Sequence, residues 1–524
     1  MKKNIVWILS LSFSGFALAQ SGPPAKDWYQ KGMSKKNMGI NLYKSYDELL
    51  KGKTGKEIVV AVIDGGTDIS HPDLKGNIWH NPGEIPFNNV DDDNNGYVDD
   101  TVGWNFIGGA NGAMVEFDNL EMTRLYRLMK AEYEDLDAED ISGNPQKAEK
   151  YLLYQKLKSE VTQNHLTYSS YEEQFGKLVK QFEKIQTETG KKDPAISEVE
   201  GYKPSGGNGE QAKSIALSQM KRGVSFQATY DQLKSQYDQV AAFAKYHYNI
   251  NYDPRGIVGD DYANSGEQYY GNNNVAGPDA SHGSHVAGII GAVRDNGYGM
   301  NGIADHVKIM VVRVVPNGDE RDKDVANGIR YAVDNGAKII NMSFGKSYKW
   351  DKQVVNEAVA YAVSKGVLLV HAAGNDNENN DLDPNYPNDS LGNGQFAATW
   401  MEIGASAPSR KKLATVFSNY GKNNVDVFAP GYQIYSTTPN NHYEYFDGTS
   451  MAAPVVSGVA ALVWSYYPQL TAVQLKDVLM KSATVNKRKV IIPGTHSKTK
   501  FTNLSVSGGV VNVYDALKMA STIK

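Results

Sequence analysis

Short runs of apolar, largely β-branched residues recur along the chain, and between them apolar residues repeat at helical spacing. Such short runs are typical of strands buried on both faces. We expect strands at 58–63, 308–315, 337–344, 367–373, 401–405 and 425–429. Helices are expected at 282–293, 322–335, 351–365, 450–467 and 472–482. This alternation predicts an α/β fold of three layers, with helices on both faces of a mainly parallel central sheet.

The pattern is interrupted once, from about residue 113 to residue 248. This segment is rich in Glu, Lys, Gln, Tyr and Leu, and it fits helices at 120–136, 147–161, 171–187 and 230–246 with a Gly-rich loop at 201–209. We interpret residues 113–248 as a helical insertion that divides one domain into residues 51–112 and 249–524. The insertion either packs as a helical hairpin on that domain or provides a contact for another protein.

The N-terminus has the features of an export signal. Lys2 and Lys3 precede an apolar run at 5–18, and Ala17 and Ala19 form a small-residue cleavage site. We predict a signal peptide at 1–19 and an N-terminal extension at 20–50. A membrane anchor is the weaker alternative, because a span needs about 20 apolar residues. Export leads to the periplasm or the extracellular space, and no later stretch is apolar enough to predict a membrane span.

Composition narrows the function classes. The formal net charge of -5 disfavours a protein that binds nucleic acid through its phosphates. The chain contains no Cys, so neither a disulfide nor a cysteine nucleophile is available. Hydrophobic residues make up 41% of the chain, which is enough for a large buried core.

Three motifs place reactive side chains at the ends of the expected elements. Asp64 ends a strand in VIDGG, His282 opens a helix in HGSHVAG, and Ser450 begins a helix in GTSMAAP. Each is weak alone, because Asp also serves turns, two close histidines also suggest a metal site, and Ser is a common helix N-cap. Together they are the base, the orienting carboxylate and the nucleophile that an activated serine requires.

A fourth motif, AAGND, places Asn375 at the end of another strand. In acyl transfer, the oxyanion that forms after attack needs hydrogen-bond donors. The backbone amide of Ser450 at a helix N-terminus is one such donor, and the side-chain amide of Asn375 is a second.

The motifs VIDGG, HGSHVAG, NMSFG, AAGND and GTSMAAP, in this order, resemble those of the subtilisin-like serine proteases. The resemblance covers about residues 37–108 and 249–517 and is absent from the insertion. It implies a secreted serine endopeptidase in which Asp64 orients His282, His282 acts as base and then acid, Ser450 attacks, and Asn375 completes the oxyanion hole. His285 then has a structural role.

The resemblance also implies how polypeptide substrates bind. Ser343, Phe344 and Gly345 resemble the segment that pairs with the substrate backbone, and together with Ala373, Gly374 and Tyr386 they are expected to line the pocket for the side chain before the scissile bond. Because these walls are small or apolar, we expect a preference for large hydrophobic side chains. Asp376 at the rim would also tolerate Lys or Arg.

An acidic loop predicts a structural calcium ion. Residues 91–100 read DDDNNGYVDD and match the start of an EF-hand loop, but Val102 stands where its closing Glu would be. The expected ligands are therefore completed from elsewhere, for instance by Asp260 or Asp261. The alternative is an acidic turn without metal. The five expected ligands within the loop are Asp91, Asp93, Asn95, the backbone carbonyl of Tyr97, and Asp99.

Two other functions remain as alternatives. One is a proteolytically silent binding protein on the same fold, which the complete set of triad residues argues against. The other is an interaction module in which the insertion is the functional part, and binding by the insertion would favour it.

Overall fold

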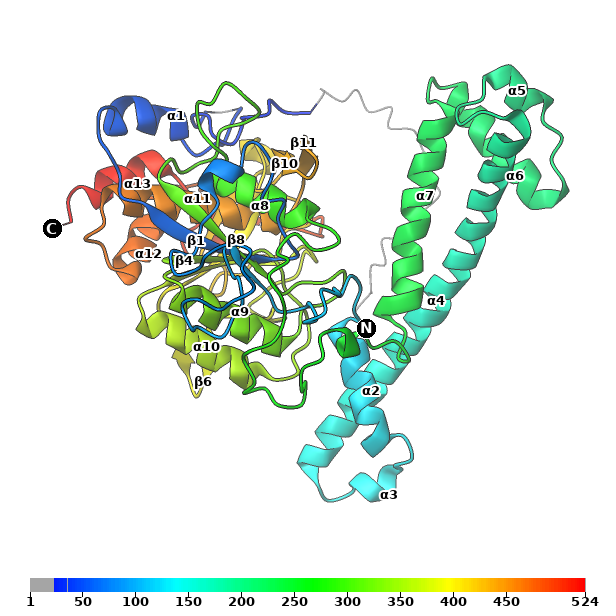
Figure 1. The fold of residues 1–524 in the computed structure, drawn as a ribbon, viewed down its shortest axis with the longest axis horizontal. Helices are drawn as coiled ribbons and strands as arrows, with labels where there is room; N and C mark the ends of the chain where they lie inside the picture. The colour runs from blue at the N-terminus through cyan, green and yellow to red at the C-terminus, as the bar shows by residue number, and fades with distance from the viewer. Residues whose placement is uncertain (1–22, 35, 524) are drawn as a thin grey trace.

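A nine-stranded sheet lies at the centre of the part of the chain that the computed structural model describes, residues 23–34 and 36–523 (Figure 1). The pairing of β12 with β15 is antiparallel, and the other pairings in this sheet are parallel. The predicted mainly parallel sheet is therefore confirmed. The predicted leader at 1–19 lies outside the described residues. From edge to edge the strands are β12 (Thr484–Val485), β15 (Gly509–Val510), β9 (Val427–Pro430), β8 (Trp400–Ser406), β5 (Leu368–Ala372), β4 (Ile339–Met342), β1 (Ile58–Asp64), β3 (Val307–Arg313) and β2 (Gly103–Asn105).

Helices cover both faces of this sheet because successive strand residues point to opposite sides. Val60 and Val62 of β1 pack into one core cluster with α8 (Ser281–Gly291), α11 (Thr449–Tyr466), α12 (Ala472–Lys481) and α13 (Val513–Ala520). Ala61 and Ile63 pack into a second cluster with α9 (Asp322–Asp334) and α10 (Lys352–Ser364). Figure 1 shows α8 and α11 above the sheet and α9 and α10 below it. The three-layer α/β fold is thus confirmed.

Two features of the sheet domain were not evident from the residue pattern. Among the described residues, α11 is the one helix long and apolar enough to cross a membrane, and 89% of its apolar window is buried inside the structure. The N-terminal segment joins the same core, since Trp28, Tyr29, Ile40 and Leu42 are at most 2% exposed.

The segment at 113–248, here called the insertion, is helical and extends to one side of the sheet domain (Figure 1). Its helices α4 and α7 run side by side. A small core around Phe175, Phe182 and Phe226 joins α4 to α6 and α7. The helices are α2 (Glu121–Tyr133), α3 (Ala138–Ile141), α4 (Pro145–Thr189), α5 (Ile196–Gly201), α6 (Gly206–Met220) and α7 (Phe226–Ala242), followed by the π-helix η3 (Phe243–His247).

The expected helices at 147–161 and 171–187 are one continuous helix of 45 residues, α4. Its interior contains no Pro, and its ends are well capped. The Asn144 side chain accepts a hydrogen bond from Lys147 N, Pro145 occupies the first turn, and Gly190 ends the helix with φ 67°. The expected Gly-rich loop at 201–209 is also shorter than predicted, because α6 already begins at Gly206.

The sheet domain also contains smaller elements. They are α1 (Leu42–Ser45), η1 (Tyr46–Leu50), η2 (Lys75–Asn77), η4 (Arg255–Ile257), β6 (Ser390–Gly392), β7 (Gln395–Phe396), η5 (Arg410–Lys412), β10 (Ile434–Thr438), β11 (His442–Phe446), β13 (Lys489–Ile491), β14 (Lys498–Lys500) and η6 (Phe501–Asn503). The hairpin of β10 and β11 lies against α8, where Ser436 and Thr437 donate hydrogen bonds to backbone carbonyls of the helix.

Candidate active site

The carboxyl end of β1 meets the first turn of α8. Asp64, the last residue of β1, is buried, and its Oδ1 accepts a hydrogen bond from Gly65 N at 2.7 Å. His282 Nδ1 lies 2.8 Å from Asp64 Oδ1 and 3.0 Å from Oδ2. This contact holds the proton on Nδ1, which leaves Nε2 as the basic nitrogen of a neutral imidazole.

The carboxylate also sets the charge of this histidine. Burial disfavours the charged imidazolium, but the adjacent Asp64 outweighs burial and raises the pKa of His282 above its usual 6.5. A carboxylate in this position stabilises the imidazolium that forms when a base takes a proton. The side chain of His282 is still 42% exposed, so a substrate can reach it.

Ser450 is the second residue of α11, and it follows Gly448, whose φ of 155° suits only glycine. Ser450 Oγ donates a hydrogen bond to Ser343 O at 3.0 Å, and Ser343 Oγ donates to Ser450 O at 2.9 Å. Within the described chain, the partner of the Ser450 hydroxyl is therefore Ser343 and not His282. A hydrogen bond between a catalytic nucleophile and its base often becomes short only when a substrate is bound.

Two N–H donors flank one point beside Ser450. A Cβ atom placed on Gly448 would lie 3.5 Å from Ser450 N and 3.6 Å from Asn375 Nδ2. Asn375 Oδ1 accepts hydrogen bonds from Thr449 N at 2.9 Å and from Thr449 Oγ1 at 3.0 Å, which fixes the orientation of the amide. Both N–H groups therefore lie near the same point beside Ser450, as the two donors of an oxyanion hole must.

A cleft of about 930 Å³ opens in front of Ser450. Of the pocket residues expected from the sequence, Phe344, Gly345, Gly374 and Tyr386 line it. Ala373 lies elsewhere, because its side chain is fully buried in a separate core cluster around Phe428. Ala372, the last residue of β5, lines the cleft in its place, since neighbouring strand residues face opposite sides of the sheet.

The other wall of this cleft comes from the insertion, which motif reasoning did not assign to the site. Helix α4 contributes four polar or aromatic side chains, and η3 with the start of α2 adds apolar ones. No signal in the sequence alone could identify them, because their position depends on how the insertion docks. The insertion residues that line the cleft are Leu120, Met122, Lys156, Glu160, Asn164, Tyr168, Phe243 and Tyr248.

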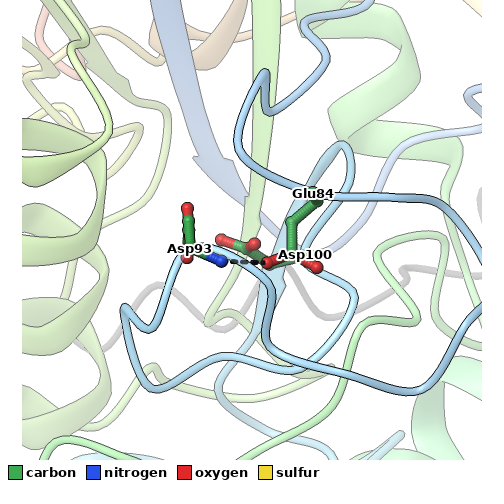
Figure 2. Close-up of side chains that lie close together, drawn as sticks. All are labelled: Glu84, Asp93 and Asp100. Carbon is green, nitrogen blue, oxygen red and sulfur yellow. Dashed lines mark hydrogen bonds between the residues drawn. The ribbon is translucent and has the colours of Figure 1, made fainter.

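The acidic loop brings together a set of carboxylates that differs from the predicted one. Glu84, Asp93 and Asp100 have ligand oxygens within 4.8 Å of one another (Figure 2). Burial raises the pKa of Asp100 to about 6. Glu84 Oε2 is buried without a hydrogen-bond partner among the described residues. Asp93 belonged to the predicted ligands, whereas Glu84 and Asp100 did not.

The other predicted ligands are engaged within the loop. Asp91 accepts hydrogen bonds from Asn95 N and Gly96 N, four and five residues further along the chain. Asn95 Nδ2 donates to Asp93 Oδ2 at 3.2 Å and to Asp100 Oδ2 at 3.1 Å.

Two of the remaining expected ligands have other partners. Asp99 accepts hydrogen bonds from Asn88 N and Asn89 N. Asp260, suggested as a ligand from outside the loop, binds Arg255 and Lys323 instead.

Comparison with known proteins places this geometry in a family. The model of the Subtilase family matches residues 55–508. The chain is 41% identical over 219 residues to a cell wall-associated protease of Bacillus subtilis (strain 168), a stretch that covers 42% of this chain and 23% of that protein. It is 36% identical over 238 residues to thermitase of Thermoactinomyces vulgaris, covering 45% and 75%.

A further relative and a solved structure cover similar parts of the chain. Identity to subtilisin DY of Bacillus licheniformis is 35% over 230 residues, which covers 44% of this chain and 77% of that protein. The structure of the prenylagaramide maturation protease PagA is matched with a TM-score of 0.38 and 28% identity, covering 47% of this chain and 83% of that one. Because the family model spans most of the described residues, the chain belongs to the Subtilase family, a family of serine endopeptidases.

Proposed function

We propose that this protein is a serine endopeptidase in which Asp64, His282 and Ser450 form the catalytic triad and Asn375 contributes to the oxyanion hole. The observation that carries the proposal is the pairing of an oriented histidine with two donors at one point beside Ser450. His282 Nδ1 lies 2.8 Å from Asp64 Oδ1, and Ser450 N and Asn375 Nδ2 lie 3.5 Å and 3.6 Å from the place that a Cβ atom on Gly448 would take.

The residues perform the reaction in two halves. In the first, His282 Nε2 takes the proton of Ser450 Oγ as this oxygen attacks the peptide carbonyl carbon, and Ser450 N and Asn375 Nδ2 stabilise the resulting oxyanion. The imidazolium then protonates the leaving amine as the C–N bond breaks, which gives an acyl-enzyme. In the second half, His282 deprotonates a water molecule as it attacks the ester carbonyl carbon. The bond between this carbon and Ser450 Oγ then breaks, His282 returns the proton to Ser450 Oγ, and the acid product leaves.

The pocket before the scissile bond favours large apolar side chains. Phe344 and Tyr386 line the cleft together with the backbone of Gly345 and Gly374. Asp376 is exposed at the rim rather than enclosed, so it offers little charge selectivity. Cleavage confined to sites after Lys or Arg would contradict this assignment.

The protein is exported, on the support of the leader pattern at 1–19. A relative from Bacillus subtilis carries the name cell wall-associated protease. N-terminal sequencing of the mature protein is expected to begin at Gln20.

Calcium is the ion that best fits the acidic loop. The buried, unpartnered Glu84 Oε2 and the carboxylates of Asp93 and Asp100 are hard oxygen donors, which Ca²⁺ prefers. The ion would hold the loop at 84–100 together by neutralising its carboxylates.

Substitution of the nucleophile tests the proposed function. Ser450→Ala should lower kcat for peptide hydrolysis by about 10⁶-fold, as expected for loss of the attacking oxygen. Ser364→Ala, which changes an exposed serine at the end of α10, is the matched control and should retain full activity. Cleavage of peptides by the Ser450→Ala protein would overturn the proposal in favour of another nucleophile. Binding of peptides by the wild type without any cleavage would overturn it in favour of a binding protein.

A further inference from the structure

The base of the insertion is joined to the sheet domain by buried ion pairs. Glu121 in the first turn of α2 lies 2.7 Å from Arg124 Nη2 and 2.8 Å from Lys346 Nζ. Lys346, which belongs to the sheet domain, also pairs with Asp322 at 2.7 Å. Burial raises the pKa of Glu121, but Arg124 and Lys346 outweigh burial and lower it to about 2. The carboxylate therefore stays charged and fixes α2 beside the cleft.

The C-terminal end of the insertion is fixed to its N-terminal end and to the sheet domain. Asn119 Nδ2, just before α2, donates to Tyr246 O at 2.6 Å and to Asn249 O at 3.1 Å, so the two ends are joined to each other. Arg321 of the sheet domain binds Asp118 at 2.7 Å and Asp253 at 2.9 Å. The wall that the insertion forms is thus held at both ends.

Helix α4 presents a stripe of side chains to the cleft. Lys156, Glu160, Asn164 and Tyr168 all line it and are spaced by four residues, so they share one face of the helix. Twelve residues of helix span about 18 Å, which matches about five residues of extended chain. The stripe belongs to the same cleft as Ser450 and is long enough to contact substrate residues well beyond the first pocket.

At one end of the stripe, aromatic rings are stacked. The ring of Tyr168 lies 4.6 Å from that of Phe243 with planes 20° apart, and 5.6 Å from that of Tyr248 with planes 15° apart. All three rings are partly exposed and line the cleft. The exposed face of a tyrosine ring attracts cations, above all the planar guanidinium group of arginine.

The charge along the cleft favours a cation as well. Burial raises the pKa of Glu320 to about 7, so this acid contributes less negative charge at neutral pH. Burial also raises the pKa of Asp319 and of Asp376. Lys346 of the lining is paired with Glu121 and Asp322. Apart from Lys156, the other charged residues of the lining are acidic: Glu160, Asp376, Glu378 and Asp383.

We propose that the wall formed by α4 and η3 binds a basic side chain, arginine foremost, of an extended polypeptide substrate, upstream of the scissile bond. Tyr168 would stack on the guanidinium and Glu160 would pair with it. We assign the upstream side by proximity, because Phe344 lines the cleft where the residue before the scissile bond is proposed to bind, and the chain continues from it to Tyr348. There the Tyr348 hydroxyl lies 3.2 Å from Glu160 Oε2 and 2.7 Å from Lys156 Nζ. This inference rests on the proposed peptidase function and adds a substrate class to it.

The test uses the full-length enzyme and peptides of 15 residues that share one cleavage site and carry a single Arg or Ala at successive positions on either side. For the wild type, we expect kcat/KM to be about tenfold higher with Arg than with Ala at one or two upstream positions, the size of a partly desolvated cation–π contact with a carboxylate nearby. Tyr168→Leu and Glu160→Gln should each reduce this Arg advantage to about threefold or less. Tyr230→Leu and Glu173→Gln, which change residues of the insertion outside the cleft, are the matched controls and should retain it.

Three results would overturn the inference: no Arg advantage in the wild type, an advantage found only downstream, or an advantage that survives both Tyr168→Leu and Glu160→Gln. An equal loss in the two control variants would also contradict it, because the effect would then not belong to the cleft wall. Cleavage of the Ala peptide that depends on Ser450 reports separately on the proposed function, so the two failures can be told apart.

Discussion

Every residue of β4, β5, β8 and β9 in the sheet domain is buried, whereas the buried residues of α4 in the insertion are nine of 45. The sheet domain is held by apolar contacts on both faces of its strands. The insertion has only a small core, and buried ion pairs such as Glu121 with Lys346 fix it to its neighbour. The difference indicates that catalytic geometry depends on a dry, rigid core, while the position of the second cleft wall depends on a few charges.

The largest effect is expected in the rigid part of the site. Asp64→Asn removes the charge that orients His282 and stabilises its imidazolium, and kcat should fall by about 10⁴-fold. The fold should persist, because an amide of the same size replaces the carboxylate. Steady-state kinetics with a short peptide measures the loss, and a decrease below about tenfold would mean that the Asp64–His282 contact is only structural.

The attachment of the insertion should respond next most strongly. Lys346→Met leaves Glu121 and Asp322 without their shared cation, and the free energy of unfolding should fall by about 3–5 kcal/mol. Lys156→Met changes an exposed lysine and is the matched control, which should change the free energy of unfolding by less than about 0.5 kcal/mol. Denaturant unfolding in a Ser450→Ala background, which prevents self-digestion, gives both values. Equal shifts would show that the buried pairs do not hold the insertion.

A smaller loss is expected at the oxyanion hole. Asn375→Leu removes a donor that acts mainly in the transition state, so kcat should fall by about 100- to 1,000-fold with KM little changed. The same kinetic measurement separates the two constants. A rise in KM with unchanged kcat would assign Asn375 to substrate binding instead.

Binding of calcium to the acidic loop is expected to stabilise the fold without changing the catalytic residues. Calcium at about 100 times its Kd should stabilise the Ser450→Ala protein by about 2.7 kcal/mol relative to chelator. Glu84→Gln combined with Asp93→Asn should remove this effect. Asp92→Asn, whose carboxylate binds Ile85 N and Asn88, is the control. Identical melting midpoints with calcium and with chelator in the parent protein would reduce the loop to an acidic turn.

The smallest expected effect is a pH dependence. Because Asp64 raises the pKa of His282 above 6.5, kcat/KM should fall on acidification with a midpoint above 6.5, as the base becomes protonated. The contribution of His282 to the stability of the fold has the opposite pH dependence and increases on acidification. A raised pKa stabilises the fold at pH values below 6.5, and this contribution is lost as pH rises through the folded-state pKa. A kinetic midpoint below 6.5 would contradict the electrostatic role given to Asp64.

The sheet domain and its reactive residues could be predicted from the sequence for physical reasons. Buried parallel strands require unbroken apolar runs, and the proposed catalytic residues stand at the end of such a run or at the start of an apolar helix. The side of the sheet that a given strand residue faces was harder to predict. For this reason Ala373 was expected in the cleft, although it is buried. Element ends also differed by a residue or two, as at β1, which continues to Asp64.

The second cleft wall and the carboxylate cluster could not be predicted in the same way. Tyr168 and Glu160 reach the cleft only because α4 is continuous and its base is fixed by Glu121. Glu84 lies outside the motif that suggested calcium, and Asp100 stands next to the Asp99 that the motif selected. Both cases depend on contacts between segments that are distant in the chain or on loop conformation, neither of which leaves a repeating pattern.

The central claim is that the sheet domain activates Ser450 as a nucleophile. Reaction of the wild-type protein with a fluorophosphonate probe, followed by mass spectrometry of the digested adduct, tests it most directly. The account predicts one adduct, on Ser450, which is abolished by Ser450→Ala and strongly slowed by Asp64→Asn. An adduct on a different residue, or labelling of the Ser450→Ala protein at the wild-type rate, would contradict it.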